Sequence, residues 1–179
     1  IDLKNGVPEP VAVIKPFDPG QLEAEYIPVV FITNRVFRQL TEETVSDLAD
    51  KVYGLIRRIE EGSHLAVSGE IQIDCDWTST TRAGYFHFLT LLKLQTGRKI
   101  SCTLRLHQIR DFKTTGVPPV DKGYLMCYAT SAPEANTSVN SILDISLLRS
   151  YTRDINQYPL PFDVALPVYS WAIVRNHLD

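Results

Sequence analysis

Apolar and polar positions along the chain follow two periods, and the change from one to the other predicts where helices and strands lie. Over residues 41–60, apolar side chains recur at helical spacing, with Thr41 as the expected N-cap and Gly62 as the stop signal. The same helical pattern covers 80–96, and a shorter helix is expected near 144–154. Elsewhere, polar and apolar residues alternate with the period of two that half-buried strands have.

Six segments have the alternation or the apolar composition of strands. They are 11–14, 27–33, 71–77, 100–107, 123–129 and 162–168. Because helices alternate with these strands, we expect crossover connections and a mainly parallel sheet. Loops with polar and aromatic residues follow most strands, as in (β/α) barrels, whose sites lie at the C-terminal ends of the strands. We therefore predict an α/β fold: a (β/α)8 TIM-type barrel seen incomplete, with an open doubly wound sheet as the alternative.

Length and composition are those of one globular domain. The chain has 179 residues, of which 44% are hydrophobic and 22% charged, with a net charge of −3. We expect residues 1–179 to form a single domain, part of one barrel, in which the Pro- and Gly-rich stretch 1–26 is irregular apart from its short strand. No block of Lys or Arg indicates nucleic acid, and no apolar run approaches the roughly 20 residues of a membrane helix. Any export signal is expected upstream of Ile1.

Three cysteines, Cys75, Cys102 and Cys127, fall inside predicted strands. Their odd number and wide spacing argue against a disulfide framework or a zinc site. Alternation places each on the apolar face of its strand, which predicts three buried structural thiols.

The segment 71–77 carries the most informative polar face in the chain. Period-two alternation places Gln72, Asp74 and Asp76 on one side and apolar residues on the other. Two carboxylates on one face of a strand are costly to bury unless they are paired or used. A site at the mouth of a barrel needs such a feature, whereas a core does not.

The later strands add polar and aromatic residues on the same side. If helices cover the apolar faces, these side chains meet in the barrel interior near the C-terminal ends of the strands. Two acids beside basic and aromatic groups are typical of a sugar-binding cleft. The added residues are Arg105 and His107 from 100–107, Tyr128 from 123–129, and Tyr169 and Trp171 beyond 162–168.

Two other interpretations of this polar face stay open. Arg105 and Asp74 could form an ion pair that only packs the barrel interior. Asp74, Asp76 and His107 could instead make a site for a hard metal ion, although no tight ligand spacing supports it.

Three motifs resemble those of the family 18 glycoside hydrolases, the chitinase-like (β/α)8 barrels. The family pattern Asp-x-x-Asp-x-Asp-x-Glu, commonly with Trp before the Glu, is similar to Ile71–Thr78, where two acids match its second and third Asp. Leu125–Ala129 is similar to the family's Met-x-Tyr-Asp strand. Leu166–Tyr169 is similar to its Gly-Leu-Pro-x-Tyr strand.

The resemblance implies a barrel whose Asp76 orients the acetamido group of a substrate and whose Tyr128 hydrogen-bonds that group. It also identifies a departure, because the family's catalytic Glu is Thr78 here. An alcohol cannot serve as general acid near neutral pH. Two functions follow: a glycoside hydrolase whose two carboxylates are Asp74 or Asp76 and another acid, or a glycan-binding barrel without catalysis.

The predicted site therefore combines catalytic and substrate-binding residues, with no cofactor and no metal. The expected partner is an oligosaccharide, and the resemblance implies a periplasmic or extracellular location. Asp74 and Asp76 are the catalytic candidates, and the substrate-binding candidates are Gln72, Trp77, Arg105, His107, Tyr128, Tyr169 and Trp171.

Overall fold

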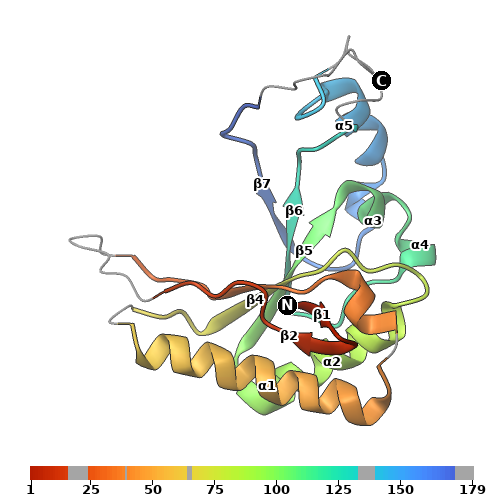
Figure 1. Cartoon of the computed structure of the whole chain (residues 1–179). Coiled ribbons are helices and arrows are strands. Elements are labelled where there is room, and N and C mark those ends of the chain that lie inside the picture. Colours follow the sequence, from red (N-terminus) through yellow and green to blue (C-terminus); the bar gives the residue numbers. More distant parts are fainter. Residues whose placement is uncertain (16–23, 39, 64–65, 133–139, 172–179) are drawn as a thin grey trace, which may run out of the picture.

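A computed structural model describes residues 1–15, 24–38, 40–63, 66–132 and 140–171 (Figure 1). Its centre is a five-stranded sheet in which every neighbouring pair of strands is parallel. Helices follow the strands along the chain, so the predicted α/β class is confirmed. The strands are β3 (Val29–Phe31), β4 (Glu70–Asp74), β5 (Lys99–Arg105), β6 (Lys122–Met126) and β7 (Phe162–Ala165).

The strands lie in the sheet in the order in which they occur along the chain, from β3 to β7. A doubly wound sheet reverses its strand order at a switch point, and the described strands show no reversal. They also do not close on themselves, since β3 and β7 are the two edges of the sheet. The described chain is thus an open parallel sheet in sequential order.

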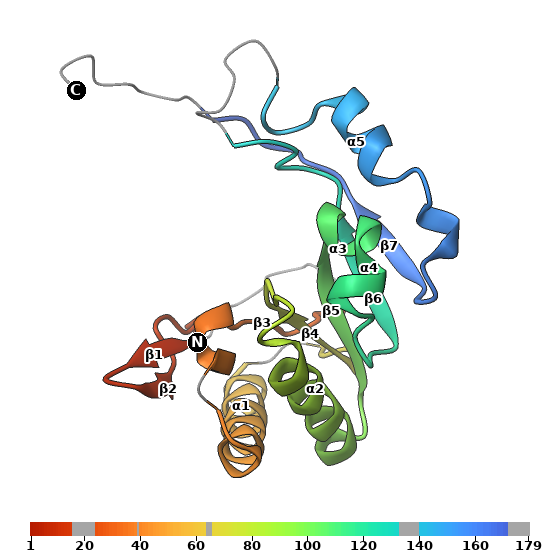
Figure 2. The same cartoon turned by 90° about the vertical axis from the view of Figure 1, so that its right-hand side faces the viewer.

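The described helices lie on one side of the sheet, and none of them covers its other side (Figure 2). The longest of them, α1 and α2, pack side by side beneath β3, β4 and β5. The helical elements are η1 (Asn34–Arg38), α1 (Glu42–Glu61), α2 (Arg82–Thr96), α3 (Leu106–Arg110), α4 (Phe112–Thr115), α5 (Ile145–Tyr151) and η2 (Ile155–Gln157).

Local sequence signals explain where these helices begin and end. Thr41 caps α1 as predicted: its hydroxyl accepts from the backbone N–H of Thr44, and Gly62 follows the last turn. Gly97 ends α2 in the left-handed conformation, with φ 63°. Asp144 caps α5 by accepting from the N–H of Leu147 at 2.9 Å, so all three predicted helices are confirmed.

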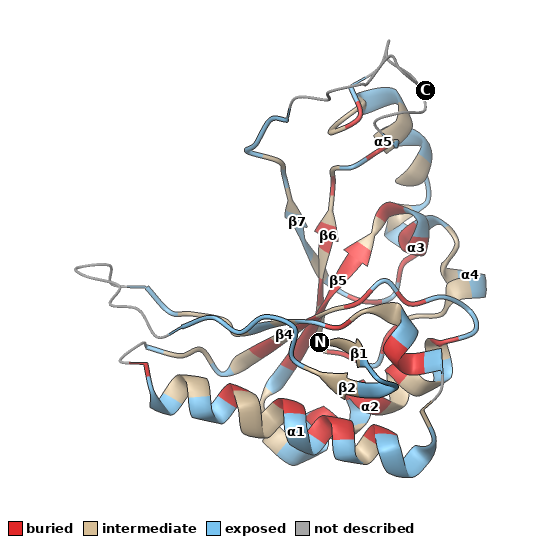
Figure 3. Ribbon diagram, in the orientation of Figure 1, coloured by how far each residue is buried: buried red, intermediate tan, exposed pale blue. Residues whose placement is uncertain are grey.

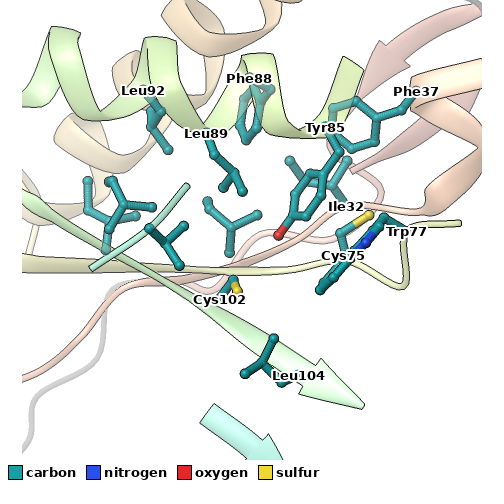
Figure 4. Packing of buried hydrophobic residues seen from close by; sticks show 14 of the residues in the cluster. Ile32, Phe37, Cys75, Trp77, Tyr85, Phe88, Leu89, Leu92, Cys102 and Leu104 are labelled. Atoms are coloured by element: carbon teal, nitrogen blue, oxygen red, sulfur yellow. The ribbon is translucent and has the colours of Figure 1, made fainter. Parts of the chain in front are cut away.

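The core forms between the helices and the covered face of the sheet. Along β4, Ile71 and Ile73 are fully buried while the residues between them are partly exposed, and the same alternation recurs in β6 (Figure 3). Tyr85, Phe88 and Leu89 of α2 point down onto this face (Figure 4). The three cysteines are free and buried there, as predicted. The apolar pattern therefore identified the core face correctly.

The N-terminal stretch differs from its prediction. Residues 11–14 form no strand, and Val11 is 75% exposed. An antiparallel hairpin lies before them instead, formed by β1 (Asp2–Lys4) and β2 (Val7–Glu9). Its turn is Asn5-Gly6, with φ of 51° and 80°, and Asn-Gly is the dipeptide that such two-residue turns favour.

The predicted strand 100–107 is also wrong at its end. β5 stops at Arg105, and α3 starts at the next residue. The reason is local: the side-chain oxygen of Gln108 accepts from the backbone N–H of Arg105 at 2.8 Å, which satisfies a donor at the start of a helix. His107 therefore lies in the first turn of α3 and not on a strand face, and the predicted loop from 108 onward contains helix.

Gly123→Ala is expected to lower the free energy of unfolding by about 1–3 kcal/mol. A Cβ at Gly123 would overlap Leu104 Cδ1 and lie 2.9 Å from Leu104 Cγ, and Leu104 is fully buried. Chemical denaturation measures the change. Gly69→Ala is the matched control, since its Cβ would meet nothing within 4 Å. Equal stabilities of the two variants would contradict the expected clash.

Candidate functional site

The uncovered face of the sheet brings the predicted acids and arginine together. Asp74 ends β4 on this face, and Asp76 follows two residues later. Arg105 ends the neighbouring strand β5 and forms a two-pronged ion pair with Asp76, with Nε 2.6 Å from Oδ1 and the second nitrogen 3.2 Å from Oδ2. The remaining guanidinium nitrogen lies 2.9 Å from the sulfur of Met126. The arginine thus pairs with Asp76 rather than with Asp74.

Asp74 lies deeper than Asp76 and has a different environment. Burial raises the pKa of Asp74, and the nearby charge of Asp76 raises it further, while Arg105 and a hydrogen bond from Thr103 act in the opposite direction. Its Oδ1 is buried and has no hydrogen-bond partner among the described residues. One carboxyl group of the pair is therefore held by a guanidinium, and the other keeps its proton to a higher pH than an ordinary aspartate.

Asp74→Asn is expected to change how stability depends on pH. The pKa of Asp74 in the native state is above the roughly 3.9 of an unfolded chain. At pH values between these two pKa values, the native state still holds a proton that the unfolded state has released. The free energy of unfolding of the wild type therefore falls as pH rises through this window. An asparagine does not titrate, so the free energy of unfolding of the variant does not fall in this pH range. Above the range, the variant is therefore more stable relative to the wild type than it is below the range. Denaturation curves across the acidic range measure the difference, and parallel pH profiles would contradict it.

Gln72 and Thr103 form hydrogen bonds next to Asp74. The amide nitrogen of Gln72 donates to the hydroxyl of Thr103 at 3.2 Å, and that hydroxyl in turn hydrogen-bonds Asp74. Thr103 is only 1% exposed, so this short chain of hydrogen bonds is shielded from solvent. Gln72 therefore acts on the position of Asp74 through Thr103.

Three aromatic residues extend the site past β6 and β7. The Tyr128 and Tyr169 rings meet edge to face at 5.9 Å, and the Tyr169 and Trp171 rings lie 5.6 Å apart. Burial raises the pKa of Tyr128, and the charge of Arg105 opposes this shift. Tyr169 and Trp171 are nearly half exposed, so their rings are accessible, although none of the three rings lines the cleft at Asp76.

Trp77, a predicted sugar contact, lies in the core instead. It is 1% exposed, and its ring stacks on Tyr85 at 5.4 Å between centroids. The indole N–H donates to the carbonyl of Thr115 at 3.0 Å. No face of the ring is free for a sugar, so Trp77 packs in the core and does not contact a ligand. Thr78 beside it donates its backbone N–H to the hydroxyl of Thr81, where α2 begins.

A cleft of about 350 Å³ opens at Asp76 and Arg105, and Asp74 does not line it. His107 and Tyr151 also line this cleft, so the structure keeps the histidine near Asp76 although it lies on a helix. Ala129 also lines the cleft and has φ 54°, a left-handed conformation that costs a residue with a Cβ about 1–2 kcal/mol. No pattern in the sequence predicts this strain, which lies directly after Tyr128.

The N-terminal end of the same face is closed by a separate polar cluster. Lys122 Nζ lies 3.0 Å from a carboxylate oxygen of Asp163 and 3.7 Å from one of Glu70. The hydroxyl of Tyr124 donates to Glu70 at 3.0 Å. Every member of this cluster is paired, which limits the reactive part of the face to the C-terminal ends of the strands.

A larger cavity lies elsewhere and has a different character. It is an apolar groove of about 700 Å³ beside the edge strand β3, lined by residues 10–14, β3 and part of α1. Neither acid of the pair nor Arg105 borders it. Its walls are mainly aliphatic, so we locate the candidate chemistry at the smaller polar cleft.

Neither the described residues nor three comparisons with known proteins add a metal site, a membrane-spanning helix or a related protein. Among the described residues, no group of three or more His, Cys, Asp or Glu is placed to hold a metal ion. None of the described helices is both long and apolar enough to cross a membrane. No protein-family model, curated protein or solved structure matches the chain. The resemblance to chitinase-like hydrolases therefore rests on the three motifs alone.

Proposed function

We propose that the protein is a carbohydrate-active (β/α)-barrel protein that acts on an oligosaccharide at the C-terminal ends of its strands. One observation carries the proposal: Asp74 and Asp76 lie on one open face, the first partly buried with a raised pKa and the second paired with Arg105. Glycoside hydrolysis uses two carboxyl groups, one protonated and one ionised. The exposed rings of Tyr169 and Trp171, which continue from Tyr128 past β6, suit the apolar faces of sugar rings.

The barrel part of the proposal is supported by the strand order. A (β/α) barrel is built from parallel strands that neighbour each other in chain order, with all helices outside. The sheet from β3 to β7 has this order, and its helices cover one face only. The polar side chains on the other face then correspond to the barrel interior.

Within this proposal the two acids have separate roles. Asp74, which keeps its proton longer, donates it to the leaving glycosidic oxygen. Asp76 is the ionised partner that activates water or attacks the sugar carbon, and Arg105 fixes its orientation. Thr78 takes no part in proton transfer.

A second candidate is a barrel that binds glycans without cutting them. It is favoured by Thr78, which replaces the acid of the motif it resembles and is engaged with the start of α2. Both candidates place the ligand at the same residues. In both, the motif resemblance makes a periplasmic or extracellular location part of the proposal.

The test is hydrolysis of a panel of natural oligosaccharides, with calorimetric binding measured in parallel. The wild type is compared with Asp74→Asn, Asp76→Asn and Asp163→Asn, the last being a matched aspartate at the other end of the same face. We expect turnover by the wild type and Asp163→Asn and none by the other two. Binding without turnover by any protein would leave the non-catalytic candidate. If no sugar binds, the carbohydrate function is wrong.

A further inference from the structure

Phe31 is an exposed aromatic residue that the sequence pattern did not single out. It is the last residue of β3 and pairs in parallel register with Asp74 on β4. Residues paired in this way project from the same face of a sheet, so Phe31 shares the polar face with the acids. It is 52% exposed, whereas the next residue, Ile32, is fully buried on the other side.

Phe31 lies on the opposite side of the acid pair from the other exposed rings. The strand order places β3 on one side of β4 and β5, and places β6 and β7 on the other. Tyr169 and Trp171 follow β7. Four strand spacings separate β3 from β7, which is roughly 19 Å at the usual distance between strands. Exposed aromatic rings therefore lie at β3 and past β7, on either side of the strands that carry the acids and Arg105.

We propose that Phe31 is a second sugar platform, and that the site binds an internal stretch of a linear glycan across the acid pair rather than a chain end. This inference rests on the proposed carbohydrate function. A ligand that contacts Phe31 on one side and Trp171 on the other must have sugar units on both sides of Asp74 and Asp76. A site that binds the end of a glycan chain needs aromatic rings on only one side of the acids.

Phe31 also forms part of the wall of the apolar groove beside β3, which suggests a matched control. Val29 lines the same groove, projects from the same face two residues earlier and is 57% exposed. It has no ring. If Phe31 matters only through the groove, Val29→Ala and Phe31→Ala will have similar effects. If the ring is a platform, only the phenylalanine variant will change glycan binding.

The experiment is calorimetry with chito-oligosaccharides and cello-oligosaccharides, each from the disaccharide to the hexasaccharide. All proteins carry Asp74→Asn so that no ligand is cut. We expect affinity to rise with ligand length, and Phe31→Ala to weaken binding of the longest ligands about tenfold while leaving the disaccharide unchanged. Val29→Ala should match the parent at every length.

Other outcomes separate this inference from the proposed function. Measurable binding that does not depend on length, or an equal loss for Phe31→Ala at all lengths, overturns the two-sided site but leaves a carbohydrate site in place. Similar losses for Val29→Ala and Phe31→Ala also overturn it. Failure of every protein to bind either series, together with no binding in the wider panel, overturns the proposed function itself.

Discussion

Replacing Trp77 with alanine is expected to lower the free energy of unfolding by about 3–5 kcal/mol, the usual cost of removing a buried tryptophan. Trp77 is 1% exposed and contacts two aromatic rings, with centroid distances of 5.4 Å to Tyr85 and 5.8 Å to Phe86. Its removal also leaves the carbonyl of Thr115 without its indole donor. Since domains of this kind are stable by only about 5–15 kcal/mol, the loss is a large share of the total. Urea denaturation followed by circular dichroism measures it.

The other tryptophan of the chain is the natural control. Trp171 is 45% exposed, so Trp171→Ala should change stability by much less. The two variants should behave oppositely in glycan binding, where only Trp171 has an accessible ring. Similar stability losses in the two variants, or weaker sugar binding by a folded Trp77→Phe variant, would contradict the positions described for these rings.

Arg105→Met is expected to reduce turnover about a hundredfold, or to weaken glycan binding if the protein does not cut its ligand. The guanidinium makes both hydrogen bonds that orient Asp76, and it is the nearby cation that opposes the rise in the pKa of Asp74. Without it, Asp76 can rotate and Asp74 keeps its proton to a still higher pH. The pH profile of turnover should therefore shift upward on its alkaline side. Stability should fall by about 1 kcal/mol or less, because the Asp76 side chain is 51% exposed.

Arg110→Met tests whether the loss of any ion pair lowers turnover and shifts its pH profile. Arg110 makes the same two-pronged contact with Asp111, at 2.8 and 2.6 Å, where α3 ends, and neither residue lines the cleft at Asp76. Exposed pairs contribute about 1 kcal/mol or less. Arg110→Met should therefore keep both turnover and its pH profile. An equal loss in the two variants would show that the Arg105 pair has only a structural role.

The helices and the core face could be predicted because their signals are local. Thr41, Gly62, Gly97 and Asp144 mark helix ends by hydrogen bonds within a few residues, and the structure shows these helices in place. The end of β5 could not be predicted, because one side chain, Gln108, decides between strand and helix. The alternation in the sequence continues smoothly through that point.

The site was predicted in part, and the limits have a physical cause. Alternation correctly placed Asp74 and Arg105, the last residues of β4 and β5, on one face, because the pleat of a strand determines the direction of its side chains. Asp76 lies beyond the end of β4 and is held there by its ion pair with Arg105. The same alternation puts Trp77 on the apolar face, where the structure buries it, so its assignment as a sugar contact was wrong. The exposure of Phe31 was not predicted, because it depends on which strand is at the edge of the sheet, a tertiary property.

The sequential order of the sheet has a consequence for how the molecule opens. β5 is hydrogen-bonded to a neighbour on each side, and its residues Ile100–Leu104 are all buried, whereas β7 is an edge with exposed residues. Backbone amides of β5 can exchange with heavy water only when the sheet comes apart, while those of β7 exchange through fraying at the edge. Each strand pairs with the next strand in the chain, so fraying can proceed inward one unit at a time. The acid pair between β4 and β5 lies in the last part to open.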